Sequence, residues 1–164
     1  MSALYEKIVR PVLFAMDAER AHRLAVASMR YLGKAPPLCA VVSLICRAES
    51  SPVNLFGLCF PNPIGLAAGM DKNAEFPRVA AALGFGHIEV GTITPKRQLG
   101  NPRPRIFRYR NSQAIVNRMG FNNRGCLQVS QRLQKAQLTK NNKVFGINIG
   151  KNAQTPLKYA IKDY

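Results

Sequence analysis

Apolar residues follow helical spacing in two stretches at the start of the chain. The first stretch has apolar residues at Leu4, Ile8, Val9, Val12, Leu13 and Met16. The second follows Asp17, a predicted helix N-cap, and includes Ala21, Leu24, Ala25, Met29 and Leu32 before Gly33 ends it. Residues three and four apart share one face of a helix, so the spacing predicts an amphipathic helical pair over residues 1–37. We expect Pro11 to kink or divide the first helix because proline has no backbone N–H.

Lysine and arginine are frequent on the polar face of this helical pair. One interpretation is a helical hairpin that packs on the main domain. The other is a surface that inserts its apolar side into an anionic bilayer. The pattern alone favours the packed hairpin and leaves the second interpretation open.

Short apolar runs alternate with helical stretches over residues 38–164. Residues 34–37 are predicted to be a linker, and residues 52–63 a short hairpin that turns near Gly57. The predicted order is then strand 64–68, helix 74–83, strand 87–90, an insertion at 94–121, helix 125–136 and strand 144–149. Arginine and proline are frequent in the insertion, which contains a predicted hairpin turning near residues 111–112. This alternation indicates a parallel sheet with right-handed helical crossovers, and Thr155-Pro156 is predicted to begin another crossover helix.

The three predicted parallel strands all end in small or polar residues. IGLAAGMDK (64–72) ends in glycine and a charged pair, HIEVGT (87–92) in Gly-Thr, and VFGINIGKN (144–152) in polar residues around glycine. The carboxyl ends of parallel strands meet at one edge of a sheet, where small residues let a ligand approach the backbone. We therefore expect the functional site at that edge.

The composition limits the possible partners. The 164 residues suffice for one domain with a core, and 47% of them are hydrophobic. A net charge of +16 and a pI near 10.4 favour anionic partners. The basic residues are scattered, however, so we expect no nucleic acid as the main partner. The cysteines lack metal-ligand spacing, no metal site is predicted, and no apolar run is long enough to span a membrane.

Four motifs in order resemble the quinone-dependent, membrane-associated dihydroorotate dehydrogenases. They are GLAAGMDKNAE (65–75), GFGHIEVGTITPKRQLGNPRPRIFR (84–108), VNRMGFNN (116–123) and GINIGKN (146–152), and DAERAHRLAV (17–26) adds to them. The resemblance implies an FMN enzyme that oxidises dihydroorotate to orotate and passes electrons to a membrane quinone. The family fold is a (β/α)₈ TIM barrel, which needs about 250 residues. Residues 38–164 would then form an incomplete barrel of about the first three βα units, preceded by the helical pair.

The resemblance also implies roles for individual residues. It places FMN against Ala68, Gly69, Met70, Asp71, Lys72, Thr92 and Asn148. It places the substrate against Lys72, Asn117, Arg118, Met119, Gly120 and Phe121. A lysine alone is more often a solvated loop residue, but a fixed cation here suits both a reduced flavin and a substrate carboxylate. Asn148 alternates with Phe145, Ile147 and Ile149, which are expected to face the helices, so its amide is expected inside the barrel. Asn122-Asn123 are expected to cap the following helix.

Further expectations concern the acceptor and the location. His22 and Arg108 are the polar residues expected in the quinone site. The family's base is a serine that we expect beyond Tyr164, so no catalytic base is assigned and the chain alone is expected to be inactive. The lack of a targeting segment favours a peripheral protein on the cytoplasmic side of a bacterial inner membrane, bound to an anionic membrane surface. The alternatives are a basic nucleic-acid-binding module and a membrane-surface adaptor that uses only the helical pair.

Overall fold

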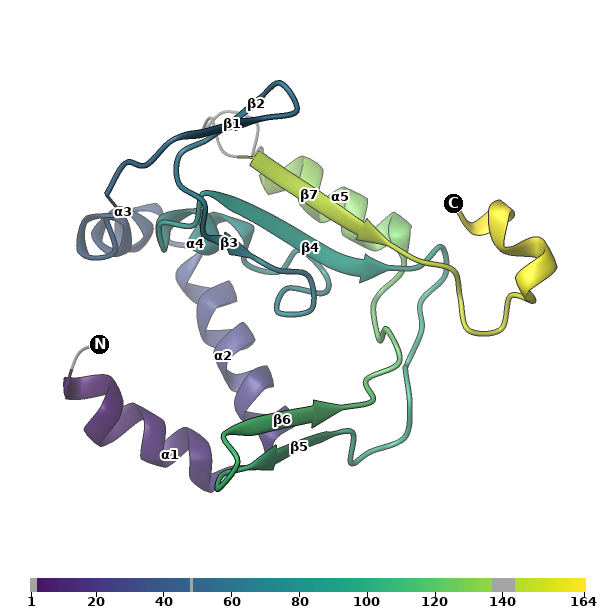
Figure 1. Cartoon of the computed structure of the whole chain (residues 1–164), viewed down its shortest axis with the longest axis horizontal. Helices are drawn as coiled ribbons and strands as arrows, with labels where there is room; N and C mark the ends of the chain where they lie inside the picture. The colour runs from purple at the N-terminus through teal and green to yellow at the C-terminus, as the bar shows by residue number, and fades with distance from the viewer. Residues whose placement is uncertain (1–2, 48, 137–143) are drawn as a thin grey trace.

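The structure is a computed structural model that describes residues 3–47, 49–136 and 144–164. Its elements, in chain order (Figure 1), are the π-helix η1 (Tyr5–Val9), α1 (Arg10–Ala15), α2 (Ala18–Leu32), α3 (Pro36–Ile45), β1 (Val53–Leu55), β2 (Leu58–Phe60), β3 (Gly65–Leu66), α4 (Pro77–Ala82), β4 (His87–Ile93), β5 (Ile106–Tyr109), β6 (Ala114–Asn117), α5 (Cys126–Ala136), β7 (Val144–Ile149) and the 3-10 helix η3 (Leu157–Asp163).

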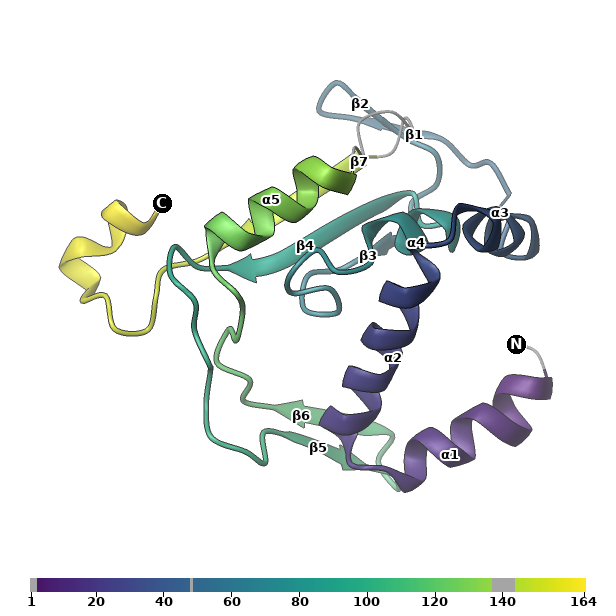
Figure 2. The same cartoon turned by 180° about the vertical axis from the view of Figure 1, so that it is seen from behind.

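A three-stranded parallel sheet in the order β3-β4-β7 forms the centre of the chain, as the alternating pattern predicted. Helices α4 and α5 cover one face of this sheet, as Figures 1 and 2 show from opposite sides. The buried apolar residues belong to that interface: Ala74, Phe76, Val79, Ala80, Ile88, Val90, Ile93 and Val129. The sheet therefore has a helix-covered face and a second face that is left for polar groups.

The front helices are formed as their sequence predicts. The Asp17 carboxylate accepts a hydrogen bond of 3.0 Å from the Arg20 N–H and so caps α2, which ends at Gly33. The first helix passes from the π-helix η1 into α1 at Arg10, just before Pro11, and its backbone stays helical across the junction, so Pro11 does not divide it. Val26 and Met29 pack against the central core, so α2 is anchored on the main domain.

Hairpin β1–β2 turns at residues 56–57, and hairpin β5–β6 pairs Ile106 with Asn117, both close to the predicted positions. Figure 1 shows β5–β6 apart from the sheet, beside the ends of α1 and α2. The insertion therefore reaches the front helices.

Several predictions of local structure were wrong. Helix α3 begins at Pro36, inside the linker predicted at residues 34–37, and continues through residues 38–45, for which no element was predicted because this uniformly apolar segment lacks helical periodicity. The carboxyl-terminal segment is a 3-10 helix, and the Thr155 hydroxyl donates to the Asp163 carboxylate at 2.7 Å where a helix cap was expected. Ile147 and Ile149 are 54% and 56% exposed, although they were expected to be covered by helices.

Within the described part of the chain, none of the helices has the length and apolar character needed to cross a membrane.

Candidate functional site

Backbone hydrogen bonds join the loop after β3 to the end of β4. The Gly69 N–H donates to the Gly91 carbonyl at 2.8 Å, and the Gly91 N–H donates to the Asp71 carbonyl at 3.0 Å. Gly69 has φ of +107°, and a Cβ built there meets no atom within 4 Å. The backbone at Gly69 therefore presents an open surface at the predicted edge, beside half-buried Ala68.

Thr92 and Asn148 meet at the same edge of the sheet. The Thr92 hydroxyl donates to the side-chain oxygen Oδ1 of Asn148 at 2.6 Å, and the side-chain NH2 of Asn148 donates to the Glu89 carboxylate at 3.0 Å. Glu89 lies opposite Gly146 across the β4–β7 pair, on the face away from the buried Ile88 and Val90. The side chain of Asn148 thus lies on the sheet face away from the helices, as its place in the sequence predicted.

The side chain of Asp71 serves the loop itself. Its carboxylate accepts hydrogen bonds from the N–H groups of Asn73, Glu75 and Phe76, at 3.4, 2.7 and 3.0 Å. Burial raises the pKa of Asp71, against the effect of those three bonds. These bonds hold the turn between β3 and α4, and they explain why α4 begins at Pro77, after the predicted start. Because the Asp71 carboxylate is buried and bonded within this turn, only the backbone of Asp71 can contact a ligand.

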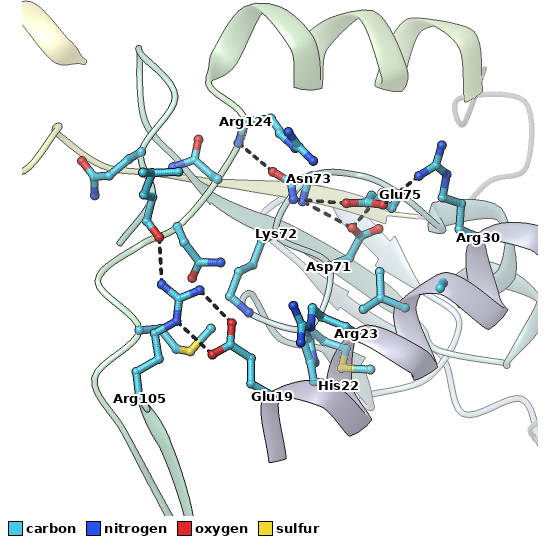
Figure 3. Close-up of a pocket in the computed structure, with 18 of the residues that line it drawn as sticks. Glu19, His22, Arg23, Arg30, Asp71, Lys72, Asn73, Glu75, Arg105 and Arg124 are labelled. Carbon is cyan, nitrogen blue, oxygen red and sulfur yellow. Dashed lines mark hydrogen bonds and ion pairs between the residues drawn. The ribbon is translucent and has the colours of Figure 1, made fainter. Parts of the chain in front are cut away.

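A cavity of about 400 Å³ lies between α2, the loop after β3 and the insertion. Lys72 enters it from the loop, with Glu19 and His22 on α2 nearby (Figure 3). Its ammonium donates to the Gly69 carbonyl, which places the charge beside the open backbone. Burial, followed by the charge of Arg105, lowers the pKa of Lys72. The pKa of His22 is also lowered, first by burial and then by the charge of Lys72. Met70 lines the same cavity and packs on the core.

Positive charge dominates the lining of this cavity. Its cationic side chains are Arg23, Arg30, Lys72, Arg97, Arg103, Arg105 and Arg124, and its carboxylates are Glu19, Asp71 and Glu75. Seven cations against three carboxylates leave an excess of positive charge. The cavity is therefore suited to an anionic ligand.

The predicted substrate loop lies only partly at this cavity. Met119 lines it, whereas Asn117 is exposed in β6 and accepts a hydrogen bond of 3.4 Å from the Met119 N–H. The Arg118 guanidinium donates to the Pro104 carbonyl at 3.2 Å, so it binds neighbouring backbone. Gly120 packs against Asn101, and Phe121 is 57% exposed. Lys72 and Met119 are thus brought together, while Asn117 is not among the lining residues.

His22 and Arg108 line different cavities. Arg108 donates to the carbonyls of Leu13 and Met16 at 3.0 and 3.2 Å, at the end of α1, and stacks on Phe14 at 4.8 Å. His22 lies with Lys72 in the cavity described above. Their shared role in a quinone site stays a prediction.

The two neighbouring asparagines after the loop have different roles. The Asn123 side chain accepts from the Gly125 and Thr94 N–H groups at 2.8 and 3.2 Å and so supports the turn before α5. Asn122 lines the cavity, and its buried side-chain oxygen has no hydrogen-bond partner among the residues that the structure describes. A buried acceptor without a partner marks a place where a ligand can donate.

Sequence reasoning missed Glu19, Glu89 and Asn122. Glu19 and Glu89 bind residues that are distant in sequence, and their local pattern carries no signal. Asn122 was interpreted together with Asn123 as a cap. Among the described residues, no group of His, Cys, Asp and Glu side chains is arranged to hold a metal ion.

These features define an α/β protein with a positively charged cavity at the carboxyl edge of a parallel sheet. The sequence profile of the family described as dihydroorotate dehydrogenase matches residues 50–164. The chain belongs to this family.

Curated relatives named dihydroorotate dehydrogenase (quinone) extend the match to the front helices. The relative from Shewanella halifaxensis is 46% identical over 161 residues, which are 98% of this chain and 46% of the relative. The relative from Methylococcus capsulatus is 47% identical with the same coverage. A crystal structure of DHODH from Eimeria tenella in complex with ferulenol has a TM-score of 0.74 and 43% identity, over 88% of this chain and 39% of that chain. The chain therefore spans less than half the length of these proteins.

Proposed function

We propose that this chain supplies flavin-facing and substrate-facing parts of a dihydroorotate dehydrogenase that uses a quinone as electron acceptor in pyrimidine synthesis. Membership of the dihydroorotate dehydrogenase family and the similarity to relatives named dihydroorotate dehydrogenase (quinone) support this function. The observation that carries the proposal is the placement of Lys72 beside the open backbone of Gly69, with Thr92 and Asn148 at the same edge.

The residues at this edge fit FMN. The open surface at Gly69 leaves room for a flat ring, and the hydrogen-bonding groups of Thr92 and Asn148 suit its polar edge. Ala68, Gly69, Met70, Asp71 and Lys72 would border the ring, the aspartate through its backbone alone. Bound FMN supplies a two-electron acceptor for the oxidation of dihydroorotate.

The cavity residues would bind and orient the substrate. The Lys72 ammonium would hold the carboxylate of dihydroorotate, and the excess positive charge of the cavity favours this anion. The buried Asn122 oxygen would accept a hydrogen bond from a ring N–H. Residues 117–121 would close over the substrate, with Met119 at its surface. Among the described residues, no serine lines the cavity, so no base is assigned to this chain.

The finer architecture belongs to the same proposal. Strands β3, β4 and β7 would be the first three strands of a (β/α)₈ barrel, and the exposed Ile147 and Ile149 would be covered by the remainder of that barrel. Leu4, Ile8 and Val12 are 62%, 58% and 59% exposed on the front helix, which also carries Lys7 and Arg10. This surface would rest on the cytoplasmic side of a bacterial inner membrane, with His22 and Arg108 toward the quinone.

The test is to fuse residues 1–164 to the part of the Methylococcus capsulatus relative that follows its matched segment. This fused protein should bind FMN and reduce a quinone with dihydroorotate, and Lys72→Met should raise the KM for dihydroorotate about tenfold or more. Lys158→Met, which changes an exposed lysine in η3, is the matched control and should leave KM unchanged. A fused protein that folds and binds FMN but fails to oxidise dihydroorotate would refute the proposal.

A further inference from the structure

A buried ion pair joins α2 to the insertion. The Glu19 carboxylate accepts hydrogen bonds from the Arg105 guanidinium, at 2.8 Å from Nη2 and 3.2 Å from Nε. The two side chains are 8% and 5% exposed, respectively. The pairing is well suited to a carboxylate because the guanidinium offers two parallel donors.

Arg105 also contacts the segment that supports the predicted substrate loop. Its Nη1 donates to the carbonyls of Leu99 and Asn101, at 2.8 and 3.1 Å. Its own carbonyl accepts a hydrogen bond of 2.9 Å from the Arg118 N–H. Asn101 in turn donates from its backbone to the Met119 carbonyl at 3.1 Å and from its amide to the Arg118 carbonyl at 2.8 Å.

These bonds form a direct path from α2 to the substrate loop. Glu19 orients the guanidinium of Arg105, the guanidinium fixes residues 99–101, and Asn101 fixes Arg118 and Met119. A buried ion pair contributes little net stability, because removing both charges from water offsets their attraction. Its chief effect here is geometric, since it determines where the loop lies relative to the cavity.

We propose that Glu19 and Arg105 are positioning residues that hold residues 118–120 in place to bind dihydroorotate. The identity of the substrate in this inference rests on the proposed function. The anchoring of the loop by Glu19 and Arg105 does not depend on it. Neither residue needs to touch the substrate. The pair acts through Asn101, Arg118 and Met119, so its loss should weaken substrate binding more than it slows the chemical step.

Arg103 provides a matched control. Its guanidinium donates to the same Glu19 carboxylate at 3.0 Å, but its side chain is 57% exposed. Solvent can replace a charge at such a position, so Arg103→Gln should leave the loop in place. Arg105→Lys keeps the buried charge but removes the fork that contacts Glu19 and two carbonyls.

Hydrogen exchange in the full 164-residue chain tests the anchoring without flavin or substrate. The Asn101 and Arg118 amides, which donate to the Met119 and Arg105 carbonyls, should exchange about tenfold faster or more in Glu19→Gln and Arg105→Lys, while amides of α5 keep their native protection. Arg103→Gln should exchange like the native chain. If the single variants unfold, loop exchange is measured instead in the double variant Glu19→Met/Arg105→Met, which replaces both charges by apolar groups and leaves no unpaired buried charge. The same faster loop exchange is expected.

The fused protein tests the consequence for binding. In Arg105→Lys, the KM for dihydroorotate should rise about tenfold while kcat falls less than about twofold and flavin content stays native. Native exchange and native KM in Glu19→Gln, or equally fast loop exchange in Arg103→Gln, would overturn the proposal. So would loss of α5 protection in every variant, because the pair would then be a general structural element. An inactive native fused protein with slow loop exchange would refute the proposed function and leave the anchoring intact.

Discussion

Gly91→Ala is the most direct test of the geometry at the carboxyl edge of the sheet. A Cβ at Gly91 would lie 2.4 Å from the Asn148 carbonyl oxygen, a backbone atom that cannot rotate away. Gly91 also has φ of +118°, where a side chain is strained. A strained backbone conformation costs about 1–3 kcal/mol, and overpacking adds about 1–3 kcal/mol. We therefore expect a loss of about 2–6 kcal/mol in the free energy of unfolding.

Two other glycines separate these contributions. Gly69 has φ of +107° but open space around a Cβ, so Gly69→Ala should show the conformational cost alone. At Gly146 a Cβ would meet the Glu89 side chain at 3.5 Å, an ordinary contact, so Gly146→Ala should be neutral within about 1 kcal/mol. Urea unfolding of the three variants with a common m-value measures the differences. If Gly91→Ala costs no more than Gly69→Ala, the close approach of β4 to Asn148 does not constrain the sheet and the reasoning is wrong.

The remaining predictions concern the polar groups of the site. Thr92→Val removes the hydroxyl bound to Asn148 and should cost about 1 kcal/mol in urea unfolding and weaken FMN binding by the fused protein several-fold; unchanged values for both would contradict the assignment. The Arg105 hydrogen bond holds the pKa of Glu19 below its usual 4.5, so its stabilisation is present above pH 4.5 and lost as the pH falls through the lower folded value. The urea midpoint should therefore drop in that acidic range, and less steeply in Glu19→Gln. Burial lowers the pKa of Lys72 below its usual 10.5, so the ammonium should lose its proton at a pH below 10.5. Orotate binding, followed by flavin absorbance, should weaken as this happens. If orotate binding by Lys72→Met weakens over the same pH range, the pH dependence belongs to another group.

Most of the strands could be predicted from the sequence because their signal is local. Strand β7 matches the predicted residues 144–149, and hairpin β5–β6 turns where the polar residues indicated. Helix α3 could not be predicted in the same way. Its segment, PPLCAVVSLI, is apolar on all sides, and Leu44 and Ile45 are 76% and 78% exposed. The two prolines were assigned to a linker at residues 34–37, and the apolar residues after them have no polar face to define a helical period.

The parts of the candidate site that could be predicted are those in which the interacting residues belong to the same sequence motif. Lys72 bonds to Gly69, three residues away, and both lie in the motif that the sequence singled out. The connections between motifs were not predictable, because they depend on how distant segments fold together. Glu19 and Arg105 are separated by 86 positions, and Thr92 and Asn148 by 56. The pairing of Thr92 with Asn148 could be anticipated only because the carboxyl ends of parallel strands lie at one edge of the sheet.

The charge of the cavity links the composition of the chain to its proposed ligand. Lys72 is half-buried, and Arg105 nearby further disfavours its charged form. Such an arrangement costs free energy in the absence of a ligand, since like charges are held together away from water. An anion bound at this place would relieve that cost and so stabilise the folded chain by mass action. A strongly basic composition is thus compatible with a small anionic substrate, because part of the excess positive charge lines the cavity where the substrate carboxylate would lie.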